Sequence, residues 1–162
     1  MKVYLRNSII YASGGGNMKK TDMLVNMLAS DIKNKDILEV ACGTADFSVS
    51  ATRIANRVSC IDLDDSRLNN LVEHNRVTFQ IMDAAKMAYA DNTFDTIVIY
   101  NSLFHIRMQW DDIEKECKRV LKNKGTIYVV GTWKLDTNLM VELFGDNAFW
   151  RDGFLIVRIV NI

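Results

Sequence analysis

The sequence predicts an α/β fold, in which a doubly wound and mostly parallel sheet is covered by helices on both faces. Two observations carry this prediction. From residue 36 onward, strand-like and helix-like segments alternate with short connections, which is typical of parallel strands joined by helical crossovers. The predicted strands are continuous apolar runs without polar alternation, as strands buried on both faces require.

Five strands follow from these runs, at residues 36–41, 57–62, 76–81, 94–100 and 125–131. Helices are expected near residues 46–56, 65–74, 110–122 and 136–145. The helix over 110–122 has the clearest pattern, because one face at helical spacing collects Trp110, Ile113, Cys117, Val120 and Leu121. Acidic residues stand in its first turn and basic residues in its last, which matches the helix dipole.

The segment after Gly131 has room for the helix over 136–145 and one further strand over Phe154–Val160. We expect this last strand to lie antiparallel to the fifth, which gives six strands and a shortened C-terminal part. It would leave an apolar sheet edge, and proteins normally cover or pair such an edge.

The N-terminal part divides into an arm over residues 1–17 and the start of a domain that spans residues 18–162. Strand-like content at Val3–Leu5 and Ile9–Tyr11 is followed by the glycines Gly14–Gly16, which form a hinge. Thr21 or Asp22 can cap the helix that comes next. The arm is expected to cover the apolar edge or to fold over a ligand. A second subunit can cover the same edge, so a homodimer is a further expectation.

The composition excludes several classes of function. Lys and Arg total 20, Asp and Glu total 20, and the net charge is zero, which argues against a nucleic-acid-binding protein. No apolar run is long enough to span a bilayer and no secretory leader opens the chain, so neither a membrane partner nor export is expected. The three cysteines have no metal-ligand spacing and are expected to be reduced and buried, as in a cytoplasmic protein.

The most informative stretch is Ile37–Phe47, where an apolar strand breaks at small residues into a helix-like segment. The small residues Ala41, Cys42 and Gly43 let the backbone approach a ligand closely. Glu39 lies inside the strand, and a buried carboxylate is costly without a partner. A cofactor with a cationic or hydrogen-bonding group is the expected partner of Glu39.

Three spaced motifs resemble those of the class I S-adenosylmethionine-dependent methyltransferases. Glu39–Ala45 resembles the acid-x-Gly-x-Gly-x-Gly motif at the end of the first strand, with alanines at Ala41 and Ala45 where the family has glycine. Asp83 followed by Asp91–Asp95 resembles the third and fourth strands of the family. Arg119–Gly125 resembles its Arg-Val-Leu-Lys-x-x-Gly stretch. The resemblance covers residues from about 20 to 131 and implies a Rossmann-like fold with S-adenosylmethionine as cofactor.

Further cofactor contacts are expected at the ends of the second and third strands. Asp62 closes the second strand, where an acidic side chain can accept from both ribose hydroxyls, although it can also be a turn residue. The resemblance places Leu63 against the adenine ring, Asp83 on the adenine amino group and the Ala84 N–H on the ring. Asp83 can equally cap a helix.

The end of the fourth strand is the expected position of the transferred methyl group. Asn101 is expected to contact the cofactor there. Nucleic-acid and protein amino methyltransferases often carry Asn/Asp-Pro-Pro-Tyr/Phe at this place, and Asn101–Phe104 lacks the two prolines. His105 is a candidate general base, with a structural role as the alternative. Phe104 and Trp133 are candidates to wall a substrate pocket.

The sequence therefore predicts transfer of a methyl group from S-adenosylmethionine to an O, N or C nucleophile of a small molecule. One alternative is a regulatory module that binds the cofactor with reduced or no turnover, because Ala41 and Ala45 replace glycines. A second is a nicotinamide-binding oxidoreductase, which needs the glycines more strictly and gives no use to Asp83 or Glu39.

Overall fold

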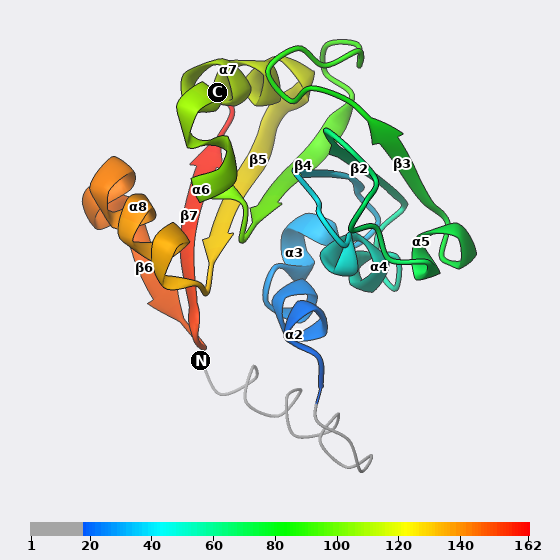
Figure 1. The fold of residues 1–162 in the computed structure, drawn as a ribbon, viewed down its shortest axis with the longest axis horizontal. Helices are drawn as coiled ribbons and strands as arrows, with labels where there is room; N and C mark the ends of the chain where they lie inside the picture. Colours follow the sequence, from blue (N-terminus) through cyan, green and yellow to red (C-terminus); the bar gives the residue numbers. More distant parts are fainter. Residues whose placement is uncertain (1–17) are drawn as a thin grey trace.

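The structure, a computed structural model, describes residues 18–162 (Figure 1). The arm expected over residues 1–17, with its hinge and its covering role, lies outside the described residues. Within residues 18–162 no helix is both long and apolar enough to cross a membrane. All three cysteines are free and buried, as expected.

The described residues form a sheet of seven strands in the order β3-β2-β1-β4-β5-β7-β6. The first five strands are parallel, and β7 runs antiparallel to both of its neighbours. The predicted doubly wound sheet is therefore confirmed. The strands are β1 (Asp36–Val40), β2 (Arg57–Asp62), β3 (Val77–Ile81), β4 (Phe94–Tyr100), β5 (Leu121–Gly131), β6 (Ala148–Arg151) and β7 (Phe154–Val160).

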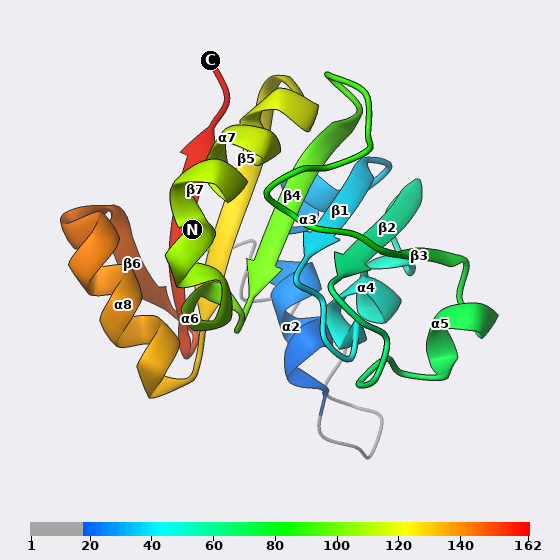
Figure 2. The same ribbon diagram turned by 45° about the horizontal axis from the view of Figure 1, so that its top comes forward.

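Helices cover both faces of the sheet (Figures 1 and 2). One face carries α2 (Lys20–Met27), α3 (Ala29–Ile32), α4 (Asp46–Ala51) and α5 (Leu71–His74). The opposite face carries α6 (Leu103–Ile106), α7 (Trp110–Val120) and α8 (Lys134–Phe144). Short 3-10 helices follow α6 and α8, at η2 (Arg107–Gln109) and η3 (Gly145–Asn147).

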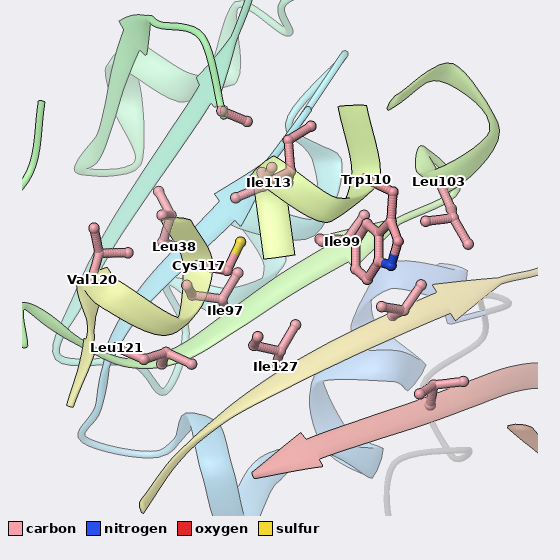
Figure 3. Packing of buried hydrophobic residues seen from close by; sticks show 14 of the residues in the cluster. Leu38, Ile97, Ile99, Leu103, Trp110, Ile113, Cys117, Val120, Leu121 and Ile127 are labelled. Carbon is pink, nitrogen blue, oxygen red and sulfur yellow. The ribbon is translucent and has the colours of Figure 1, made fainter. Parts of the chain in front are cut away.

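Each face of the sheet has its own hydrophobic core. On one face, Trp110, Ile113 and Cys117 of α7 pack over Leu38 and Ile97 of the sheet (Figure 3). These are residues of the apolar face predicted for the 110–122 segment. The core on the other face joins α2 and α4 to the sheet through Leu24, Phe47, Cys60 and Ile156, among others.

The packing around Gly125 explains why the Arg119–Gly125 stretch ends in glycine. A Cβ at this position would lie 2.9 Å from the carbonyl oxygens of Asp95 and Lys122. Any side chain would force the backbone apart, since real Cβ atoms do not come this close. Gly125 thus lets β5, which pairs with β4 from Leu121 onward, run beside it without a clash.

The expectation of six strands was wrong, because β6 adds a seventh. β6 and β7 form a hairpin whose turn residues, Asp152 and Gly153, have φ values of 49° and 86°. An Asp-Gly pair between two apolar runs is a strong hairpin signal, and the expectation of a single strand over Phe154–Val160 made no use of it. The sheet edge is therefore β6, where Phe149 and Trp150 are exposed, and β7 is paired on both sides.

Two helix predictions also differ from the structure. The helix expected over 65–74 is reduced to Leu71–His74, because Asp64 accepts from the Ser66 N–H and Asn69 from the Leu71 N–H. Such local bonds offer the backbone an alternative to a helix. α2 begins at Lys20, and neither Thr21 nor Asp22 caps it; the Thr21 hydroxyl instead hydrogen-bonds that of Ser50 at 2.7 Å.

Candidate functional site

A cavity of about 760 Å³ opens at the carboxyl ends of β1 to β5, where a doubly wound sheet binds its ligands. The residues that line it come from the loops after these strands and from the start of α2. All ten predicted site residues are among them: Glu39, Ala41, Cys42, Gly43, Asp62, Leu63, Asp83, Ala84, Asn101 and His105.

The loop between β1 and α4, residues 41–45, forms the floor of the cavity. Ala41, Gly43 and Ala45 all have positive φ, at 55°, 54° and 61°. This conformation is easy for glycine and strained for alanine. The Gly43 N–H donates to Asp62 Oδ2 at 2.7 Å, and the Ala41 carbonyl accepts from Ser102 Oγ at 2.7 Å. Bonds from two neighbouring strands therefore hold the strained loop in place.

Glu39 lies beneath this loop and is only 2% exposed. Its Oε1 accepts from the backbone N–H and the hydroxyl of Ser48, at 3.2 and 2.7 Å. Burial raises the pKa of Glu39 to about 8, and the two Ser48 hydrogen bonds oppose that rise. The nearby charges of Asp46 and Asp62 raise the pKa further. Glu39 is therefore a carboxyl group whose ionisation a neighbouring cation would favour.

Asp62 ends β2, and its carboxylate accepts from the backbone of the next residue and from the backbone of the loop at residues 41–45. Its Oδ1 accepts from the Leu63 N–H and its Oδ2 from the Gly43 N–H, both at 2.7 Å. Each carboxylate oxygen has a second lone pair, so both oxygens can still accept from a ligand. Leu63 is 67% exposed beside it, which is unusual for a leucine and leaves an apolar surface over the cavity.

Asp83 follows β3 and makes a local turn. Its Oδ1 accepts from the Ala85 N–H at 2.9 Å, while the rest of the side chain is exposed to the cavity. Ala84 is buried next to it. The alternative that Asp83 caps a helix is wrong, because no helix follows it; its carboxylate instead holds the turn at residues 84–85.

The Asn101 side chain is bound to Thr132 across the ends of β4 and β5. Its Oδ1 accepts from the Thr132 N–H at 2.8 Å and its Nδ2 donates to Thr132 Oγ1 at 2.9 Å. Asn101 has a φ of 51°, a conformation that asparagine tolerates better than most residues. Although Asn101 lines the cavity, its amide group is committed to fixing the two strand ends.

His105 is exposed on α6, at the edge of the cavity formed by the loops after β4 and β5. The N-terminal turn of α6 is held by Asp136 of α8, whose carboxylate accepts from the Phe104 N–H at 2.9 Å and is 2% exposed. Trp133 lines the cavity and is 52% exposed. Phe104 does not line it, contrary to expectation; its ring lies 3.8 Å from the Arg107 guanidinium.

Several lining residues were not predicted from the sequence: Lys19, Lys20, Thr21, Asp46, Arg67, Asn69, Ser102 and Thr132, among others. Ser102 and Thr132 follow strand ends, and this position in the sequence is the signal that marks them as candidates. Nothing in the sequence around Arg67 distinguishes it from a surface residue. Within residues 18–162 no group of three His, Cys, Asp or Glu side chains is placed to hold a metal ion.

Comparisons with known proteins agree with this geometry. A family model described as a methyltransferase domain matches residues 38–129. The ubiquinone/menaquinone biosynthesis C-methyltransferase of Haemophilus ducreyi is 31% identical over 60% of this chain and 41% of its own length. The ribosomal RNA large subunit methyltransferase G of Photobacterium profundum is 24% identical over 86% of this chain and 41% of its own length.

Among solved structures, the S-adenosylmethionine-dependent methyltransferase of Aquifex aeolicus superposes with a TM-score of 0.69 over 88% of this chain and 90% of that one, at 15% identity. This likeness shows the fold. The chain spans less than half the length of the curated relatives it matches.

Proposed function

This chain belongs to the methyltransferase domain family, the class I S-adenosylmethionine-dependent methyltransferases, and from that premise we propose that it transfers a methyl group from S-adenosylmethionine to a small molecule. The acceptor atom is an oxygen, nitrogen or carbon. The observation that carries the proposal is the convergence of Glu39, Asp62, Asp83 and His105 on one cavity at the carboxyl ends of the strands.

The residues around the cavity fit this cofactor. The cavity volume lies within the usual range for ligand sites, roughly 300–1,000 Å³. A side chain at Gly43, where φ is 54°, would strain the backbone over which the cofactor would lie. Asp62 has acceptor capacity left for the two ribose hydroxyls, Leu63 offers an apolar surface to adenine, and Asp83 and the Ala84 N–H lie where the polar edge of that ring would be bound.

The bound cofactor supplies a methyl group on a sulfonium ion, which is already activated toward nucleophiles. The protein then has to align the acceptor, exclude water and compensate charge. Glu39 contributes the compensating negative charge beneath the loop at residues 41–45. Its carboxyl group is buried and bonded to Ser48, so it can lose its proton when a cation arrives.

His105 and Trp133 stand at the part of the cavity assigned to the acceptor. A neutral imidazole at His105 would accept the proton that a hydroxyl or amine loses as it is methylated. Trp133 would cover an apolar part of the acceptor and keep water out. The balanced net charge of the chain favours a small molecule over a nucleic acid as that acceptor.

A second candidate function is cofactor binding without turnover. The observation that favours it is the backbone at Ala41 and Ala45, where the family has glycine and this chain has alanines at positive φ. A strained loop can bind the cofactor more weakly or less accurately. A labelled-methyl transfer screen against a panel of metabolites separates the two candidates, because only the enzyme would release labelled product.

Cofactor binding itself is tested by calorimetry with S-adenosylhomocysteine on the Asp62→Ala variant. We expect its affinity to fall by about 1.5–3 kcal/mol, the range for hydrogen bonds to a charged group. Asp65→Ala is the matched control, since Asp65 is exposed on the same loop and does not line the cavity. Equal affinities for the two variants would remove Asp62 from the cofactor site.

A further inference from the structure

Arg67 lines the cavity and is exposed. It belongs to the loop between β2 and α5, yet its guanidinium group reaches over the loop at residues 41–45. The Cβ position of Gly43 is 3.6 Å from Arg67 Cζ and 3.7 Å from both Nη1 and Nη2. Three nearly equal distances mean that the guanidinium presents its flat face, not its N–H edge, to this position.

These N–H groups have no acceptor among residues 18–162: Arg67 makes no side-chain hydrogen bond there and has no carboxylate within 4 Å. Asp64, the acidic residue three positions earlier, instead accepts from the N–H and the hydroxyl of Ser66. The guanidinium therefore offers five donors in a flat fork with no protein acceptor bound to them.

The charges around the cavity indicate what ligand group these donors would bind. Five carboxyl groups line it, those of Glu39, Asp46, Asp62, Asp64 and Asp83. They suit the sulfonium and ammonium groups of S-adenosylmethionine, but they repel its carboxylate. That carboxylate needs a cation, and the cations lining the cavity are Lys19, Lys20 and Arg67.

We propose that Arg67 binds the carboxylate of the methionine part of S-adenosylmethionine, an inference that rests on the proposed function. The charged group of Arg67 lies beside Gly43, in the loop at residues 41–45 over which the cofactor would lie. A guanidinium can hold a carboxylate through two parallel N–H···O bonds, which a lysine cannot do. Lys19 and Lys20, at the start of α2, are exposed, as Arg67 is.

The test compares two ligands that differ in this group. S-adenosylhomocysteine has the amino-acid end, and 5′-methylthioadenosine has the same nucleoside without it. Calorimetry on Arg67→Gln should show S-adenosylhomocysteine binding weakened by about tenfold or more, the scale of a lost bond to a charged group, with 5′-methylthioadenosine changed less than about twofold. Arg67→Lys should fall between the wild type and Arg67→Gln.

Lys20→Gln is the matched control, because it removes a second lining cation and should leave the ratio of the two affinities unchanged. If Lys20→Gln lowers that ratio and Arg67→Gln does not, Arg67 is not the carboxylate site. Tighter binding of both ligands by Arg67→Gln would show that Arg67 blocks the cavity, which also overturns the proposal. A wild type that binds neither ligand overturns the cofactor proposal as well, whereas binding of both with an unchanged ratio in Arg67→Gln overturns only the role of Arg67.

Discussion

Two walls of the cavity are held together in different ways. The strand wall consists of residues 100–105 after β4 and 131–137 after β5, and it is held by bonds between residues far apart in the chain. Ser102 bonds Ala41, Asn101 bonds Thr132 and the Phe104 N–H bonds Asp136. The loop wall consists of residues 62–71 after β2, and it contains several bonds that span one or two residues, at Asp62, Asp64 and Asn69. It is tied to the loop after β1 by the bond between Asp62 and the Gly43 N–H.

This difference separates stability from binding. The bonds of the strand wall are buried or partly buried, so removing one leaves an unsatisfied group inside the protein. The local bonds of the loop wall, at Asp62, Asp64 and Asn69, are exposed, and water can replace them. Substitutions in the strand wall, and in the cavity floor at residues 41–45, should therefore change the free energy of unfolding. Substitutions that remove only the exposed local bonds of the loop wall should change ligand affinity alone.

The largest expected effect is a pH dependence that originates at Glu39, which is bonded to Ser48 beneath the loop at residues 41–45. The pKa of Glu39 is about 8 in the folded protein and 4.5 ordinarily. Between these two pH values, Glu39 is protonated in the folded state and ionised in the unfolded state. The stabilisation by protonated Glu39 is complete below about pH 4.5 and is lost as the pH rises to about 8. Between about pH 4.5 and 8, the free energy of unfolding should fall by about 1.4 kcal/mol for each pH unit.

Urea denaturation of the wild type and Glu39→Gln between pH 5 and 8 measures this slope. The variant has no group to ionise at this position and should show a flatter profile. Parallel profiles for the two proteins would mean that Glu39 is already ionised in the folded protein. Glu39 would then make no pH-dependent contribution to the free energy of unfolding in this range.

The next largest effect is expected at Asp136, in the strand wall. Asp136→Ala leaves the Phe104 N–H without an acceptor and should lower the free energy of unfolding by about 1–3 kcal/mol. Asp136→Asn keeps an acceptor oxygen and should retain most of the stability. Asp64→Ala, in the loop wall, is the control and should leave the melting temperature unchanged; a comparable loss there would break the distinction between the walls.

The smallest effect on the free energy of unfolding is expected from a glycine substitution in the strained loop at residues 41–45, the floor of the cavity. Ala41→Gly should stabilise the protein by about 0.5–1 kcal/mol, because the αL strain of alanine is somewhat larger than the entropic cost of glycine. The same change in α4, Ala51→Gly, should destabilise by about 1 kcal/mol, because the φ of a helix suits alanine. Thermal denaturation of both variants gives the two signs, and a loss of stability in Ala41→Gly would contradict the assignment of strain.

The sequence predicted what depends on local pattern. The positions of the five parallel strands in the chain and the apolar face of α7 follow from periodicity, and both are confirmed. The missing strand β6 is four residues long with two exposed aromatic side chains, so it lacks the buried run that identified the others. Its turn at Asp152–Gly153 was the available signal.

The candidate site divides in the same way. Residues at strand ends were predicted to meet because parallel strands end at one edge, and all ten line the cavity. Their roles toward a cofactor remain predictions. The partner of Asn101 is 31 residues away and that of Phe104 is 32. Nothing local specifies such pairs, and nothing local indicates that Arg67 turns back over Gly43.

The distribution of the cysteines makes the two cores separately observable. Cys42 and Cys60 belong to the core beneath α2 and α4, and Cys117 to the core beneath α7 and α8. Burial raises the pKa of Cys117 to about 12, and the pKa of Cys42 is also raised, by a hydrogen bond with Cys60 and by burial. Cys42 also lines the cavity, whereas Cys60 and Cys117 are fully buried. Since only an exposed thiolate reacts with an alkylating reagent, Cys60 and Cys117 are labelled when their own halves of the molecule open. The protein thus carries a natural reporter on each face of its sheet, and the two labelling rates compare the opening of the two halves without an engineered cysteine.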